Sequence, residues 1–173
     1  MHLFRSTDGG RTWQPVRLAV PPGVDSADRL TRIGTPVRDP AGTRLWLATA
    51  VSDEQGDVAT FVECSADGGA TWSVCGEPLI GWPVWAREDP RAGWDITGLQ
   101  QAPMVFSTDG GRTWLIRMSE DLVRWLGTDR PADVMVDALS THEAWVVLRN
   151  EGQDDLRFHT RDGGEHWEQL APR

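Results

Sequence analysis

The sequence predicts an all-β protein built from repeated four-stranded antiparallel sheets. One eight-residue pattern, Ser-x-Asp-Gly-Gly-x-Thr-Trp, occurs three times in 173 residues, and a weaker fourth copy follows. Apolar segments with strand-like alternation precede each copy. Copies that follow one another at intervals of about 40 to 60 residues are typical of folds assembled from equivalent units.

Each copy of the pattern predicts a tight hairpin corner. Asp-Gly between two strands favours a turn in which glycine adopts a positive φ, and the aspartate carboxylate accepts hydrogen bonds from the turn amides. The serine or threonine two residues earlier adds a local bond, and the tryptophan begins the next strand as an apolar plug between sheets. We expect a structural role for Ser6, Asp8, Trp13, Ser65, Asp67, Trp72, Ser107, Asp109, Trp114, Thr160, Asp162 and Trp167.

Apolar segments upstream complete each unit. Each of the last three boxes follows three such segments, so a unit is read as strand, strand, strand, box, strand. The strands predicted before the boxes are 2–5, 30–33, 45–48, 58–62, 83–86, 94–96, 104–106, 134–138, 144–148 and 156–159. The chain is thereby divided into a half unit at 1–18 and whole units at about 28–76, 80–118 and 131–170.

The segment 118–127 interrupts the strand pattern. Ser119 is a good N-cap, acidic residues follow it, and Gly127 stands past the end, which together predict a short helix. Leu122, Trp125 and Leu126 would share one face of it. We expect this face to cover a junction between units.

The four boxes resemble the Asp-box, or BNR, repeats of sialidases, sortilin-type receptors and xyloglucanase-type glycosidases, and their spacing resembles most the repeats of photosystem II assembly factor-like (YCF48-like) propellers. The resemblance implies an Asp-box β-propeller of four-stranded antiparallel blades, either partial, at about three and a half blades, or completed by oligomerisation. Because the repeat occurs in enzymes, receptors and scaffolds, it implies a fold more than a function. The open edge of the half blade favours self-association or truncation over a closed monomer.

Composition excludes several partners. A net charge of -9 argues against nucleic acid or an anionic membrane surface. The chain has no apolar run long enough to span a bilayer, and no signal peptide is expected from its first residues. All 17 basic residues are arginine and tyrosine is absent, which indicates GC-rich coding and a prokaryotic source. The acidity also disfavours a photosystem assembly factor proper.

The segment 81–94 is the candidate ligand-binding region. Its three tryptophans and two arginines could form an aromatic and cationic ledge for a sugar or a peptide. The candidate contacts are Trp82, Trp85, Arg87 and Arg91. The favoured alternative is that Trp85 and Trp94 pack in the core. The predicted function is a non-catalytic binding or scaffolding module that recognises a protein or glycan through loops between blades.

A glycoside hydrolase fragment with an incomplete active site is the alternative function. The tyrosine nucleophile of a sialidase is absent, and residues 31–36, which faintly resemble a sialidase element, are more simply a first strand. Nothing in the spacing selects a facing pair from the candidate carboxylates. These are Asp25, Asp28, Glu88, Asp89, Asp95 and Asp129. No cofactor or metal is expected, since His2, His142, His159 and His166 are scattered without a ligand motif.

The two cysteines flank the second box. In a simple hairpin register Cys64 lies opposite residue 73, so Cys75 is its diagonal neighbour at about 7 Å. That separation favours free thiols, although a bulge would allow a disulfide. The redox compartment therefore stays open.

Overall fold

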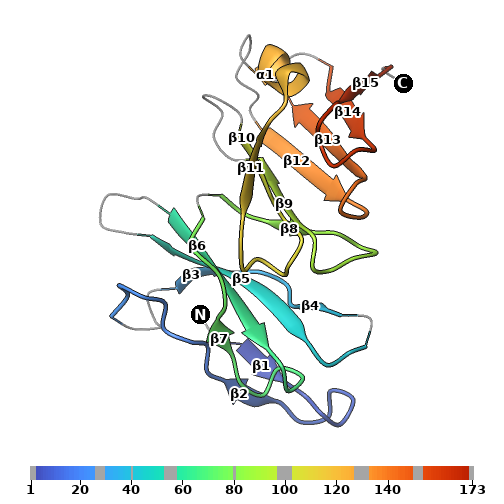
Figure 1. Ribbon diagram of the computed structural model, residues 1–173. Coiled ribbons are helices and arrows are strands. Elements are labelled where there is room, and N and C mark those ends of the chain that lie inside the picture. Colours follow the sequence, from blue (N-terminus) through green and yellow to red (C-terminus); the bar gives the residue numbers. More distant parts are fainter. Residues whose placement is uncertain are drawn as a thin grey trace. The chain divides into compact units, whose positions relative to one another are not determined.

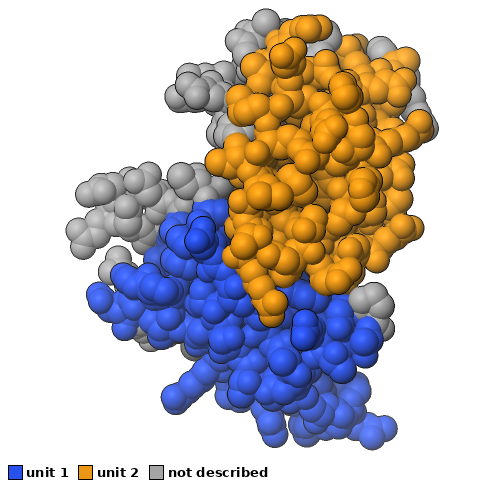
Figure 2. Space-filling model, viewed as in Figure 1, with its two compact units in different colours: residues 1–80 blue, residues 81–173 orange. Residues whose placement is uncertain are grey.

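The computed structural model describes residues 3–25, 30–39, 41–52, 58–79, 81–96, 103–126, 133–149 and 154–171 (Figure 1). Its strands form antiparallel sheets of two, five, four and four strands, as the repeats predict. The chain divides into two compact units, residues 1–80 and 81–173, which are described separately (Figure 2). Within the described residues no helix has the length and hydropathy of a membrane span.

Unit 1 contains the two-stranded and the five-stranded sheet. The small sheet pairs β1 (Leu3–Arg5) with β2 (Gln14–Val16) across the first box. The larger sheet has the order β3-β5-β6-β7, with β4 also pairing with β5. Its strands are β3 (Leu30–Ile33), β4 (Val37–Arg38), β5 (Leu45–Ser52), β6 (Val58–Ser65) and β7 (Ser73–Val74).

The fifth strand of this sheet arises because the first blade strand is interrupted. β3 pairs with the C-terminal half of β5 and β4 with its N-terminal half. Between them lies Pro36, which has no N–H to donate to a ladder, while the amide of Gly34 still donates to Ala48 O at 2.8 Å. The segment 31–36 is thus a broken first strand of a four-stranded blade.

Cys64 and Cys75 form a disulfide, so the preference for free thiols was wrong. The predicted register is correct, because Cys64 lies opposite Ser73. The Cα atoms are nevertheless only 5.7 Å apart. Strand twist shortens one of the two diagonals between neighbouring strands, and the estimate for a flat sheet omitted this effect.

Unit 2 contains two four-stranded meanders. The first has the order β11-β10-β9-β8 and the second β12-β13-β14-β15. The strands of the first are β8 (Val84–Trp85), β9 (Gly93–Ile96), β10 (Pro103–Ser107) and β11 (Leu115–Met118). Those of the second are β12 (Asp133–Ala138), β13 (Ala144–Arg149), β14 (Leu156–Thr160) and β15 (Glu168–Leu170). A shared core that includes Trp94, Met104, Phe106, Val146 and Phe158 joins them.

The predicted helix is α1 (Glu120–Leu126), which follows β11 directly. Leu122 is buried in the shared core of unit 2. The Asp121 carboxylate accepts a hydrogen bond from the backbone amide of Trp167 at 3.1 Å. The helix therefore joins the fourth box to the core of this unit. The side chains of Trp125 and Leu126 lie outside the described part.

The pattern predicts that all four box tryptophans are core residues, but the structure buries them to different degrees. Trp167 is 5% exposed, and Trp72 and Trp114 are half-buried. Trp13 is 60% exposed, so its assignment to a core between blades was wrong. The reason is the two-stranded sheet that carries it, because no described strand extends the pair of β1 and β2, whereas the other sheets have four or five strands.

Candidate functional site

The Asp boxes are closed by hydrogen bonds of their own. In the second box, Asp67 Oδ1 accepts the amides of Ala70 and Thr71 at 2.9 Å each, and Asp67 Oδ2 accepts the Thr71 hydroxyl at 2.7 Å. The Ser65 hydroxyl donates to the same carboxylate and accepts the amide of Gly69 at 2.8 Å. The two glycines of this box have φ values of 67° and 87°, a region that side chains disfavour.

These bonds hold the box carboxylates ionised. The hydroxyl of Thr12, followed by its amide and the Ser6 hydroxyl, lowers the pKa of Asp8 to about 2. The amide and then the hydroxyl of Thr71 lower the pKa of Asp67 far below its usual range. A carboxylate with its lone pairs occupied in this way is a poor general acid or base. We treat the boxes as structural corners.

The fourth box differs in its closing residue. His166 replaces the threonine of the other boxes, and its Nδ1 lies 2.7 Å from Asp162 Oδ2. With Glu165, these side chains offer three metal-ligand atoms within 4.8 Å of one another. All three residues are exposed, and the His166 contact already completes the box. Sequence reasoning missed this arrangement because the partners of His166 are the nearby carboxylates of Asp162 and Glu165 and not a second histidine or a cysteine.

Loops at the same end of the two unit 2 sheets hold each other in place. The amides of Arg87 and Glu88, after β8, donate to the carbonyls of Ala138 and Leu139 at 3.1 and 2.8 Å. The Trp94 indole donates to Ser140 O at 2.9 Å. These bonds and the shared core fix the first sheet against the second, so the side chains between their loops have a defined geometry.

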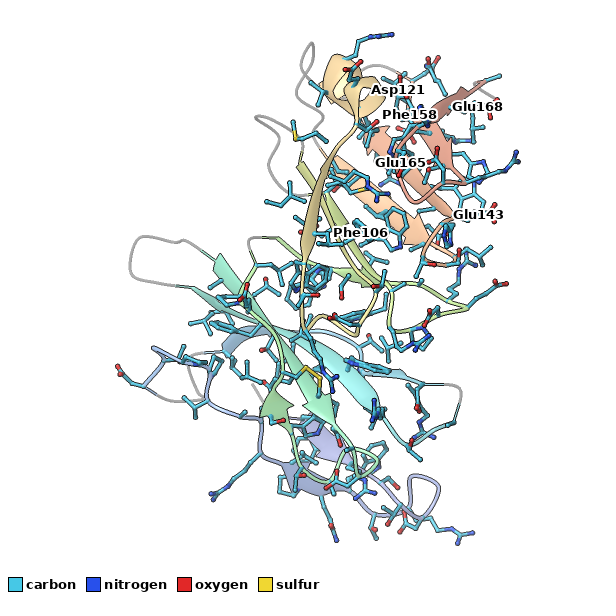
Figure 3. All side chains as sticks on the ribbon, in the orientation of Figure 1. Phe106, Asp121, Glu143, Phe158, Glu165 and Glu168 are labelled. Atoms are coloured by element: carbon cyan, nitrogen blue, oxygen red, sulfur yellow. A yellow bond between two sulfur atoms is a disulfide. The ribbon has the colours of Figure 1, made fainter. Side chains whose placement is uncertain are left out.

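A cavity of about 420 Å³ lies between these loops. Its lining consists of residues from the β8–β9 loop, the third box, β10, β11, the β12–β13 loop and the fourth box. Its lining residues are Asp89, Arg91, Phe106, Thr108, Arg117, Thr141, His142, Asp162, Gly163 and Glu165. Figure 3 labels two of these lining residues, Phe106 and Glu165. We call this cavity the unit 2 groove.

Charges of both signs line the unit 2 groove. Arg91 Nε donates to Asp89 at 3.1 Å, and this hydrogen bond lowers the pKa of the Asp89 carboxyl. The Arg117 guanidinium lies 4.6 Å from the centre of the Phe106 ring and donates to Gly163 O. It also approaches Glu165 at 3.8 Å. The side chains of Arg91 and Glu165 are mostly exposed and open to a ligand.

The structure separates the four predicted ligand contacts. Arg91 lines the unit 2 groove, whereas Arg87 pairs with Asp137 at 2.7 Å, outside the lining of the groove. Trp85 packs against Trp114 with ring centres 6.1 Å apart. Trp82 is half-buried and its backbone amide donates to Asp95. These residues therefore form no continuous aromatic ledge.

The candidate carboxylates are also dispersed. Asp89 lines the groove, Glu88 is exposed beside it in the chain, and Asp25 belongs to unit 1. Asp28 and Asp129 lie outside the described residues. Asp95 is buried in β9, where burial raises its pKa to about 6 against the opposing hydrogen bonds of the Trp82 and Ile96 amides. It does not line the groove.

Sequence reasoning missed a second buried carboxyl, Glu63 in β6. Its side chain is fully buried, and Oε2 accepts the amide of Ala19 at 2.9 Å. Burial raises the pKa of Glu63 to about 7. The only signal in the sequence is that glutamate is the one charged residue of this strand.

Comparisons with known proteins agree with the architecture. A family model described as the BNR/Asp-box repeat matches residues 4–15. Among solved structures, one described as YCF48 bound to D1 peptide aligns with a TM-score of 0.50 and 19% identity, over 82% of this chain and 41% of that one. The chain has the blade fold of an Asp-box β-propeller.

A second structure that aligns with this chain is described as a GH74 enzyme from Niastella koreensis. It aligns with a TM-score of 0.44 and 17% identity, over 97% of this chain and 34% of the enzyme. This chain thus spans less than half the length of either structure. A search of curated proteins gives no match.

Proposed function

We propose that this Asp-box protein is a non-catalytic binding module that recognises a polypeptide segment in the unit 2 groove. The observation that carries the proposal is the mixed charge of the groove, in which exposed Arg91 and Glu165 stand on loops of two different sheets. A polypeptide with side chains of both signs complements such a surface. Loops on a fixed scaffold are the usual location of binding residues.

The aromatic rings favour a polypeptide over a glycan. Sugar rings stack on exposed aromatic faces, but Trp94 is buried, Trp85 packs against Trp114, and Arg117 covers Phe106. The lining of the groove contains no other aromatic ring than Phe106 and the His142 imidazole. Recognition in the groove therefore depends on hydrogen bonds and charge. The YCF48 structure, which is described as bound to a peptide, provides a parallel for such a ligand.

The acid–base properties of the groove favour binding over glycoside hydrolysis. Hydrolysis requires one carboxyl with a raised pKa facing a second carboxyl. In the groove, hydrogen bonding with Arg91 lowers the pKa of Asp89, and the hydrogen bonds of the fourth box lower that of Asp162 despite the opposing effect of burial. Both are poor proton donors near neutral pH.

An immobilised peptide library, with a glycan array in parallel, tests the proposal. The full chain should select peptides that carry both an acidic and a basic residue, and Arg91→Ala combined with Glu165→Ala should reduce that binding by at least about tenfold. Arg87→Ala is the matched control, because Arg87 is an exposed arginine outside the groove lining. Selective glycan binding, peptide binding that the double variant retains, or turnover of aryl glycosides would contradict the proposal.

A further inference from the structure

The outermost strand β11 differs from the other strands that follow a box. Leu115, Ile116 and Met118 are 55%, 72% and 56% exposed, which gives three large apolar side chains in four consecutive residues. β11 pairs with β10 on one side and with no described strand on the other. An apolar strand at the edge of a sheet is a template for pairing with another chain.

The three equivalent strands have features that discourage such pairing. β2 contains Pro15, which cannot donate to a ladder, β7 is two residues long, and β15 has Glu168 and Gln169. Proline, short length and charge are the usual ways in which edge strands avoid association. In β11 the one charged residue is Arg117, whose guanidinium turns onto Phe106 and Gly163 O of its own unit. The edge of β11 therefore lacks this protection.

We infer that β11 is a self-association surface, and that it pairs antiparallel with β11 of a second copy of this chain around a two-fold axis at Ile116. A two-fold axis perpendicular to the sheet pairs the residues of the two strands so that the two residue numbers in every facing pair have the same sum. Centred at Ile116, Ile116 meets its own equivalent, Trp114 faces Met118 of the second copy, and Leu115 faces the aliphatic stem of Arg117. Apolar side chains then oppose apolar groups on both faces of the joined sheets.

Charge complementarity selects a second copy as the occupant of this edge. The same register directs Arg112, just before β11, toward Glu120 of the second copy, at the start of α1. Both residues are exposed, and neither side chain forms an ion pair or hydrogen bond with another described residue. The two-fold axis forms this pair twice. A register centred one residue later would instead oppose the two Arg117 side chains, which carry like charge.

The oligomeric state of the chain tests the inference. Light scattering across a concentration series should give twice the chain mass of 19.2 kDa, and Ile116→Lys should weaken the dimer by at least about tenfold. Met135→Lys, a change at an exposed apolar residue of β12, is the matched control and should leave the dimer intact. Circular dichroism of each variant verifies that it is folded.

Cross-linking and charge exchange test the register. Ile116→Cys should form a covalent dimer under oxidation, because opposite β carbons lie about 5 Å apart. Met118→Cys should not, because the Met118 of the second copy lies four residues along the strand from the position opposite it. The native cysteines are already paired with each other. Arg112→Glu should weaken the dimer, and Arg112→Glu combined with Glu120→Arg should restore it.

Several results would overturn the inference. One is a chain that is monomeric at every concentration, and another is a dimer that Ile116→Lys leaves intact. A dimer that Phe4→Lys dissociates and Ile116→Lys does not would assign the interface to β1. A monomer whose β11 captures a strand of a different protein would also contradict it.

Discussion

The first and fourth Asp boxes have nearly the same internal bonds and opposite surroundings. Asp8 Oδ1 accepts the amide of Thr12 at 2.9 Å, and Asp162 Oδ1 accepts the amide of His166 at 3.0 Å. The tryptophan that follows is exposed in the first box and buried in the fourth. The corner is therefore a local structure that eight residues specify, whereas the burial of its tryptophan depends on strands and helices elsewhere in the chain.

The neighbours of Trp167 show what the first box lacks. Its sheet has four strands, its backbone amide is held by Asp121 of α1, and its ring belongs to the shared core of unit 2. Trp13 follows a corner in a two-stranded sheet, and its indole donates to Gly10 O within the same box. Two-stranded hairpins have little stability of their own.

The largest effect is expected from removing the two tryptophans in turn. Trp167→Ala should lower the free energy of unfolding by about 3–5 kcal/mol, because it leaves a cavity in the core of unit 2. Trp13→Ala should cost less than about 1 kcal/mol, since its ring is already in contact with solvent. Urea unfolding of the two variants measures both values. Equal losses would show that the two boxes do not differ in the way the structure describes.

The position four residues before the box aspartate gives a second comparison. Phe4 is exposed there, Phe158 is buried, and in the second box the buried residue is Glu63. Because the pKa of Glu63 rises from 4.5 to about 7 on folding, the folded chain binds an extra proton between these pH values. Stability should fall by on the order of 3 kcal/mol as the pH rises through this window.

Glu63→Gln should remove this part of the pH dependence. Denaturant unfolding from pH 4 to 8 would give the free energy of each chain. The smaller decline left in the variant would belong to Asp95, whose pKa burial raises to about 6, and to His166, whose pKa is raised by Asp162. If the variant and the unmodified chain show identical pH profiles of stability, Glu63 does not ionise as a buried group in this pH range.

Removing the box hydroxyl should have a smaller, position-dependent effect. Ser107 accepts the buried amide of Gly111 at 2.8 Å, and Ser6 accepts the exposed amide of Gly10 at 2.7 Å. Ser107→Ala should lower the free energy of unfolding by about 1–2 kcal/mol, because a buried amide loses its acceptor. Ser6→Ala should lower it by less than about 0.5 kcal/mol, because water can take the place of the hydroxyl. Thermal unfolding of both variants tests this difference between the two boxes. Equal shifts in Tm would refute it.

The smallest effect concerns the histidine that closes the fourth box. The hydrogen bond and charge of Asp162 raise the pKa of His166. The charged pair therefore stabilises the fold fully below the ordinary histidine pKa, and this contribution is lost as the pH rises through the raised value. His166→Thr should make the Tm difference between pH 5.5 and pH 8 smaller. If the variant shows the same Tm difference between the two pH values, the pair of His166 and Asp162 has no role in stability.

The blade fold could be predicted because its information is local. Each corner depends on residues within eight positions, such as Asp67 and Thr71, and the strands beside it alternate visibly. The exposure of Trp13 and the disulfide of Cys64 with Cys75 depend on strand number and strand twist. Neither property can be read from the repeat itself.

The candidate site could be predicted only in part. Arg91 was identified from its segment, but the groove also needs Arg117 from β11 and Glu165 from the fourth box, which only the packing of two sheets brings together. The apolar edge of β11 was visible in the sequence as Leu-Ile-Arg-Met. Its exposure follows from its outermost position, which the alternation of residues does not reveal.

Amide hydrogen exchange at Thr12 and His166, the same position in the first and fourth boxes, tests the contrast most directly. Both amides donate to a box aspartate at nearly equal distance, so local bonding alone would protect them equally. We expect Thr12 to exchange through a small local opening, and His166 only through an opening close to the global unfolding of unit 2. Equal protection at the two positions would contradict the conclusion that distant strands, and not the box, decide how firmly each corner is held.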